Sequence, residues 1–407
     1  MIKKSFYTLL GDDMPINEKT VLSTSFSSYL DDTTLYEAVK NGLDLQTLDN
    51  KNDLLRHAKC GVIVQMLLDA GADASSRDQS GKTALCFPKD AEAVQLLIQA
   101  GCDINAVDSE NRSALFYITD PLSLRLLIDA GADCRITSNN RETPLHFAAN
   151  AQSVALFIAS GLDPNARDNG ERTPLHAAKN ADVVQALIQA GADIELHDLT
   201  GSTPLFSAPD TDSVELLLAA GADVNARNDS KSTPLAYARN EDVAQALIDA
   251  GADINASDCE HNTPLHAQIR WHPNTAMLLI IAGADVNARN QKNETPLFYA
   301  STPELIRTLI RHGAEVNIQN KRKETPLHCA NSDACALCLI ENGADIRAKD
   351  RDGNTTLMAC VQYKETVKKL LEAGLDPSVR NNSGLTALLL SNNPEVTELL
   401  LKNEKKH

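Results

Sequence analysis

The sequence predicts an all-α solenoid built from about twelve repeated helix-turn-helix units with projecting turns, and two recurring motifs predict it. A Thr-Pro-Leu motif begins at Thr143, Thr173, Thr203, Thr233, Thr263, Thr295 and Thr325. A glycine followed two residues later by an acid occurs at Gly42, Gly71, Gly101, Gly131, Gly161, Gly191, Gly221, Gly251, Gly283, Gly313, Gly343 and Gly374. Units that recur in this way bury their apolar surface against their neighbours, so the repeat fixes the architecture.

The elements of one unit follow from its residues in order. The proline after the threonine suits the first turn of a short helix, because that position needs no N–H donor. Seven residues after the threonine, a polar side chain is placed to cap a second helix. These capping residues are Asp90, Asp120, Asn150, Asn180, Asp210, Asn240, Thr302, Ser332 and Asn393.

The second helix is predicted by apolar residues at helical spacing, such as Val184, Leu187 and Ile188. It ends at the glycine, which tolerates the left-handed conformation of helix ends. The segment that follows has turn chemistry, as at Asp168-Asn169-Gly170. Each unit is therefore a helix, a tight turn, a second helix and a projecting finger.

These motifs resemble the ankyrin repeat. Residues 173–178 read T-P-L-H-A-A and residues 221–226 read G-A-D-V-N-A, as in that family. The resemblance covers about residues 50 to 403, with weaker copies from Asp53, Thr83, Ser113, Thr355 and Thr386. The period is mostly 30 residues instead of about 33, because the turn between the helices is shorter.

The predicted organisation has three parts. Residues 1–50 form an N-terminal cap or partial repeat, in which residues 1–30 are either part of the cap or a mobile docking or delivery segment. Residues 51–403 form a continuous repeat array. Residues 404–407 are a charged tail.

The composition argues against one class of function and indicates the kind of partner and location to expect. The net charge of −17 and the lack of a basic stripe argue against nucleic-acid binding. The charge mildly favours a basic protein partner, although twelve of the acids belong to the glycine motif. No leader or membrane span is recognised, and the nine cysteines show no pairing pattern, so a cytoplasmic monomer without a cofactor is expected.

Two sets of residues resemble metal ligands. His146, His176, His266 and His328 share one motif position, where the family resemblance implies hydrogen bonds between neighbouring turns. Cys335 and Cys338 suggest zinc, but they stand where other units carry packed apolar residues and no second cysteine pair completes the site. We therefore expect no metal. No catalytic motif is present either, so we predict that the chain is not an enzyme.

Binding residues are expected where the period is kept and the residue identity varies. The repeat from Thr263 carries a two-residue insertion with the only tryptophan of the chain, and tryptophan and arginine are common in interface hot spots. The alternative is that Trp271 covers a local gap. The candidate residues are Arg141, Glu171, Arg172, Lys231, His261, Arg270, Trp271, His272, Lys292, Lys321, Arg322, Lys323, Arg351 and Tyr363.

The predicted function is a protein-interaction scaffold that binds a partner through its concave face and fingers. Two alternatives remain open from the sequence. One is a stoichiometric inhibitor, such as an immunity protein that caps a toxin or another enzyme. The other is a secreted effector that displays its repeats to a host protein.

Overall fold

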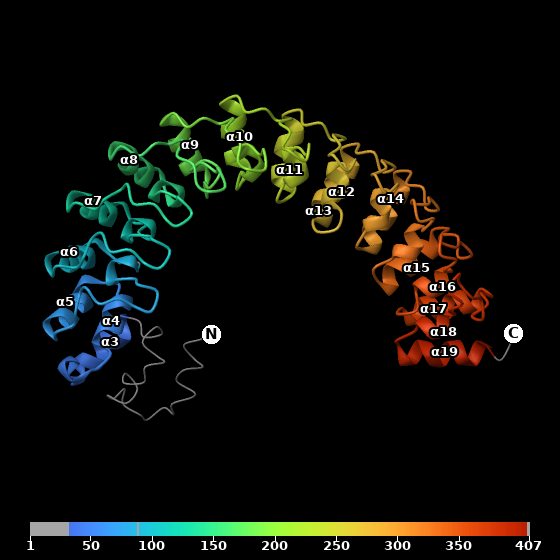
Figure 1. The fold of residues 1–407 in the computed structure, drawn as a ribbon, viewed down its shortest axis with the longest axis horizontal. Helices are drawn as coiled ribbons and strands as arrows, with labels where there is room; N and C mark the ends of the chain where they lie inside the picture. Colours follow the sequence, from blue (N-terminus) through green and yellow to red (C-terminus); the bar gives the residue numbers. More distant parts are fainter. Residues whose placement is uncertain (1–31, 88, 405–407) are drawn as a thin grey trace. The chain divides into compact units, whose positions relative to one another are not determined.

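The computed structural model describes residues 32–87 and 89–404 (Figure 1). Contacts divide the chain into two units, Met1–Leu199 and Thr200–His407, and each unit is described by itself. The predicted roles of residues 1–30 and of the tail at 405–407 lie outside the described residues. The single continuous array over 51–403 stays a prediction.

The second helices of the repeats stack in chain order within each unit (Figure 1). In the first unit they are α5 (Gly61–Asp69), α6 (Ala91–Gln99), α7 (Pro121–Asp129), α8 (Ala151–Ala159) and α9 (Ala181–Gln189). In the second unit they are α10 (Thr211–Ala219), α11 (Glu241–Asp249), α13 (Pro273–Ile281), α14 (Pro303–Arg311), α15 (Asp333–Glu341), α17 (Lys364–Glu372) and α19 (Pro394–Glu404). These helices account for the twelve predicted units.

The first helix of most units is a single 3-10 turn, which is shorter than the helix of the prediction. These turns are η2 (Ala84–Cys86), η3 (Ala114–Phe116), η4 (Pro144–Phe147), η5 (Pro204–Ser207), η6 (Pro234–Tyr237), η7 (Pro296–Tyr299) and η8 (Pro326–Cys329). The α-helical ones are α4 (Lys51–His57), α12 (Pro264–Gln268), α16 (Thr356–Ala359) and α18 (Ala387–Leu390). Helix α4 shows that a unit of this length can hold a longer first helix, because α4 has seven residues.

The chain before α4 also follows the repeat. Helix α3 (Asp32–Lys40) precedes Gly42, whose φ of 99° is left-handed, and η1 (Leu45–Thr47) comes next. This is the order of a second helix, its glycine and the following segment. The cap or partial repeat over residues 1–50 stays a prediction, because the structure describes this segment only from residue 32.

The predicted caps of the second helices are confirmed. Eight of the capping side chains accept a hydrogen bond from the backbone N–H three residues later, as Asn180 does from Val183. Asn393 accepts from the N–H of Glu395. Each cap satisfies a donor that the helix itself leaves open, so the polar residue fixes where the helix begins.

The core is a row of apolar side chains, one from each second helix. Leu97, Leu127, Leu187, Leu217 and Leu247 occupy the same position of their helices and are at most 1% exposed. Each helix packs against its neighbour along this row, as α6 does on α7 and α10 on α11. Apolar burial between repeats therefore supplies most of the stability.

The fingers are joined by one backbone hydrogen bond between neighbouring repeats, as from Asn169 N to Asn140 O at 2.7 Å. The residue two positions before the threonine is left-handed. Glycine holds this position at Gly81, but Arg141, Lys231 and Lys323 adopt it with φ near 60°. A non-glycine residue there costs about 1–2 kcal/mol.

Asparagine side chains form a second connection between repeats. The Asn225 amide donates to Gly251 O at 3.2 Å and accepts from Asp253 N at 2.7 Å. Asp253 in turn accepts from Asn255 N within its own turn. The acid after the glycine is thus part of the scaffold, as the sequence suggested.

The motif histidines connect neighbouring fingers. His146 accepts from Thr143 N through Nδ1 at 3.1 Å and donates to Arg172 O through Nε2 at 3.1 Å. His266 bonds in the same way to Thr263 and to Glu294 O. The structural role implied by the family resemblance is confirmed for these two residues.

We expect stability to fall on mild acidification because burial lowers the pKa of His146, His266 and His328. Because the pKa of each histidine is lower in the folded state than in the unfolded state, the unfolded chain takes up protons at a higher pH than the folded chain. The stabilisation is therefore complete above about pH 6.5 and is lost as the pH falls below it. Urea unfolding midpoints at about pH 7.5 and about pH 5.5 measure the effect.

The matched variant replaces all three histidines with phenylalanine, the residue at Phe116, Phe206 and Phe298. Its midpoint should change less between the two pH values than that of the parent. An unchanged pH dependence in the variant would contradict the assignment to these histidines.

All nine cysteines of the chain are free thiols. Cys335 and Cys338 are buried in α15, where they pack as small apolar side chains. Across the part of the chain that the structure describes, no cluster of three His, Cys, Asp or Glu side chains is arranged to hold a metal ion. The same residues include no helix that is long and apolar enough to span a membrane.

Candidate functional site: the insertion groove

The two-residue insertion lengthens the first helix of its repeat. Helix α12 runs from Pro264 to Gln268, and Gln268 donates to Ala236 O and Ala238 O of the preceding repeat at 2.9 and 3.0 Å. Ile269 is fully buried. Ile269 therefore fills the space under the turn, and Trp271 is left 71% exposed.

The two exposed residues of the insertion form a pair. The Arg270 guanidinium lies over the Trp271 ring, 5.1 Å from its centroid. No carboxylate of the described chain forms an ion pair with Arg270. The ring attracts the guanidinium, and the N–H groups of Arg270 can still bond to another group.

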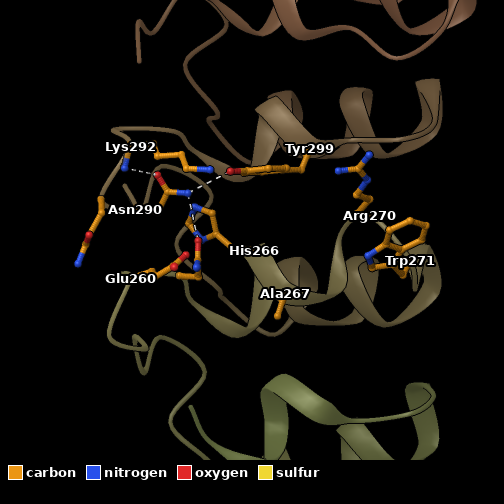
Figure 2. Close-up of a pocket in the computed structure, with 10 residues that line it drawn as sticks. Glu260, His266, Ala267, Arg270, Trp271, Asn290, Lys292 and Tyr299 are labelled. Carbon is orange, nitrogen blue, oxygen red and sulfur yellow. Dashed lines mark hydrogen bonds between the residues drawn. The ribbon is translucent and has the colours of Figure 1, made fainter. Parts of the chain in front are cut away.

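A groove of about 330 Å³ starts at this pair and runs to the fingers of two neighbouring repeats (Figure 2). We call it the insertion groove. It is lined by Glu260, Asn262, His266, Ala267, Arg270, Trp271, Asn290, Gln291, Lys292 and Tyr299. It brings together three of the predicted binding residues, Arg270, Trp271 and Lys292.

The floor of the groove is held by internal hydrogen bonds. The Tyr299 hydroxyl donates to the Glu294 carboxylate and accepts from Asn290 Nδ2, which is 3.1 Å away. Burial, with the bond to Glu294, raises the pKa of Tyr299 to about 12. Burial also lowers the pKa of His266. Both rings are therefore uncharged at neutral pH.

The candidate residues Lys321, Arg322 and Lys323 form a basic finger beside the groove. Lys321 N donates to Lys292 O at 2.9 Å, which stacks the finger of residues 320–325 on the finger that carries Lys292. Arg322 is paired with Asp352 at 3.2 Å. Lys321 and Lys323 are exposed and form no ion pair within the described chain.

The other candidates of the second unit lie outside the groove. Lys231 and Arg351 are exposed on other fingers, and His272 precedes α13 without capping it. His261 lines a neighbouring hollow of about 340 Å³. Tyr363 is half-buried, and its hydroxyl donates to Ala330 O at 2.9 Å, so its role in binding stays a prediction.

Three candidates belong to fingers of the first unit. Arg141 is exposed, with its backbone left-handed. Glu171 is paired with Arg167 at 2.6 Å. Arg172 lies 3.8 Å from Asp168, and its carbonyl accepts from His146. The last two side chains thus have partners within their own fingers.

A comparison with protein families agrees with this architecture. A family model described as ankyrin repeats in three copies matches overlapping segments from residue 83 to residue 407. The segments are 83–168, 120–198, 153–228, 177–258, 206–290, 265–350 and 331–407. The chain belongs to the ankyrin repeat family. Ankyrin repeats are protein–protein interaction modules, and their fold is a non-catalytic scaffold.

Among solved structures, the chain is similar to one titled "Crystal structure of the ankyrin repeat domain of Bcl-3: a unique member of the IkappaB protein family". The identity is 31%, the match covers 50% of this chain and 100% of that chain, and the TM-score is 0.40. A search of curated proteins finds no match.

Several residues of this ankyrin groove were missed by sequence reasoning. Asn290 and Tyr299 form its floor, and Ala267 leaves its centre open. One signal was available for Ala267, since the same motif position holds Tyr237 and Tyr299 in the adjacent repeats. A small residue between two large ones marks a hollow in a stacked array.

Proposed function

We propose that this ankyrin protein is a scaffold that binds a partner protein through the insertion groove and catalyses no reaction. The observation that carries the proposal is Trp271, a large aromatic side chain left 71% exposed beside Arg270. Exposing an indole to water is unfavourable, and a partner surface that covers it recovers that free energy. Tryptophan and arginine are also the residues that contribute most at interfaces.

The titratable groups of the groove support a binding role. His266 uses both ring nitrogens in bonds within the chain, and Tyr299 donates its proton to Glu294. Neither group is free to move a proton to or from a substrate. The groove therefore offers contact surface and charge, with no acid–base pair aimed into it.

The nine free thiols support a reducing compartment, and we place the protein in the cytoplasm on that ground. We also propose a monomeric chain before the partner binds, because exposed charged residues such as Arg141, Lys231 and Lys323 lie on the fingers.

The experiment is an affinity pull-down from the native cell extract with the intact chain and a Trp271→Ala variant. We expect the parent to capture a protein that the variant loses, because the variant removes the exposed anchor of the groove. The activity of the captured protein, measured with and without the chain, then separates a scaffold from an inhibitor.

The matched control is Tyr237→Ala, which removes another exposed aromatic side chain of the second unit, 50% exposed and outside the groove. This control should retain the partner. A partner captured equally by Trp271→Ala and by the parent would place recognition elsewhere and refute the proposal.

A further inference from the structure

We infer that the insertion groove takes an extended acidic segment of its partner, with carboxylates on both sides of an apolar or aromatic side chain. The inference rests on the proposed function and names the chemistry of the partner at the same site. It follows from the charges on the rim, the surfaces of the floor and the space between them.

Two unpaired cations define the rim. Figure 2 shows Arg270 and Lys292 on opposite sides of Tyr299. Both are exposed, and neither has an ion-pair partner within the described chain. Two carboxylates of one extended segment can therefore pair with them while the residue between lies over the tyrosine. Arginine presents a planar edge that binds a carboxylate through two parallel bonds.

Further cations extend the rim along the stack of fingers. Lys321 and Lys323 follow Lys292 in the next finger and are also exposed and unpaired. The backbone of Lys323 is left-handed, with φ of 59°. This conformation costs a lysine more free energy than it would cost a glycine. A segment that leaves the groove in this direction meets positive charge again.

Several carboxylates near the groove oppose this charge. Asp258 acts electrostatically on His266 and accepts backbone N–H groups of its own finger. Glu294 and Glu260 differ in their bonds. Glu294 accepts hydrogen bonds from Tyr299 and from Asn320 Nδ2, the latter at 3.1 Å. Its carboxylate is therefore already hydrogen-bonded within the floor of the groove. Glu260 is exposed at the opposite finger, with no ion pair of its own. Removing the charge of Glu260 should therefore strengthen the binding of an acidic segment.

The overall charge of −17 does not reverse this preference. Charges farther apart than about 8 Å are largely screened at physiological ionic strength. Much of the acidity also lies in the glycine motif, where Asp253 and its equivalents accept backbone N–H groups of their own turns. The charges next to the groove decide what binds there.

The centre of the groove has room for one apolar side chain. Ala267 is exposed at the position that holds Tyr237 and Tyr299 in the neighbouring repeats. The rings of Trp271 and Tyr299 lie around this opening (Figure 2). Contact with two aromatic rings favours an apolar or aromatic side chain at the middle of the bound segment.

The test uses the fluorescence of Trp271, which is the only tryptophan of the chain and lies in the groove. Three synthetic peptide pools of equal length carry a central phenylalanine, flanked by Asp and Glu, by Asn and Gln, or by Lys. We expect the acidic pool to shift the emission to shorter wavelength at the lowest concentration. Its affinity should fall as salt is added.

Four variants of the full chain test the geometry. Arg270→Gln and Lys292→Gln should each weaken binding of the acidic pool by about three- to fivefold, as expected for exposed ion pairs. Glu260→Gln should strengthen it by about twofold. Ala267→Phe should abolish binding by filling the groove, and the natural Phe147 at the same motif position shows that the fold accepts this residue.

The control variants are Arg311→Gln and Lys368→Gln, which remove exposed, unpaired cations of the same unit outside the groove. Both should bind the acidic pool as the parent does. Equal binding of the acidic and neutral pools, tighter binding of the lysine pool, or no response to any pool would overturn the inference.

A single-stranded oligothymidylate forms the last arm of the test. A larger fluorescence response to it than to the acidic pool would assign the cations to phosphate and overturn the inference. The proposed function fails separately, through a pull-down that does not depend on Trp271. If the captured partner depends on Trp271 but the three peptide pools bind equally, the proposed function stands and only the preference for an acidic segment is refuted.

Discussion

Replacing Leu127 with alanine should lower the free energy of unfolding by about 2–5 kcal/mol, the largest single effect that we expect. Leu127 is fully buried in α7, which packs against α6 and α8. Truncation removes apolar contacts on both sides and leaves a cavity, because the neighbouring helices are held by their own caps. Urea unfolding of the parent and the variant measures the loss.

The same helix supplies the control. Leu122 is 68% exposed in α7, so Leu122→Ala should change the free energy of unfolding by no more than about 0.5 kcal/mol. Hydrogen exchange should also show that Leu127→Ala loosens α6 and α8 more than α5, because each repeat contacts only its neighbours. Equal midpoints for Leu127→Ala and the parent would refute the packing of this core.

Replacing Asp333 with alanine should cost about 1–3 kcal/mol, because Asp333 caps a helix of the next repeat. The repeat of helix α17 has one extra residue near Tyr363, since Gly343 and Gly374 are 31 residues apart, and α17 has no side-chain cap of its own. Asp333 accepts from Glu365 N at 3.0 Å and from Thr366 N at 2.9 Å. The Thr366 hydroxyl, which is fully buried, also donates to this carboxylate. Urea unfolding again gives the measurement.

Glu241→Ala is the matched control for this cap. Glu241 occupies the equivalent first position of α11, before the other insertion, but its carboxylate meets only the Asn274 side chain, 3.4 Å away. This variant should unfold within about 0.5 kcal/mol of the parent. If both variants lost the same free energy of unfolding, the hydrogen bonds from the backbone N–H groups of Glu365 and Thr366 to Asp333 would contribute nothing to stability. Asp333→Asn, which keeps an acceptor oxygen, should lose less than Asp333→Ala.

The sequence by itself determined the repeat, the starts of the capped second helices and the scaffold roles. Each of these depends on contacts within a few residues or at one fixed period. A cap such as Asn180 meets an N–H three residues away, and His146 meets a carbonyl 26 residues later, in the next finger. Local rules and the regular stack were therefore enough to predict them, and the high exposure of the fingers followed as well.

Only the tertiary structure decided the site, because it depends on how side chains fill space between repeats. The insertion could have buried either Ile269 or Trp271, and the fit of Ile269 under the turn turned the tryptophan outward. The groove joins Arg270 to Lys292 and Tyr299, residues of the next repeat. No periodic rule predicts such a junction, since packing at one irregular turn sets which side chains face each other.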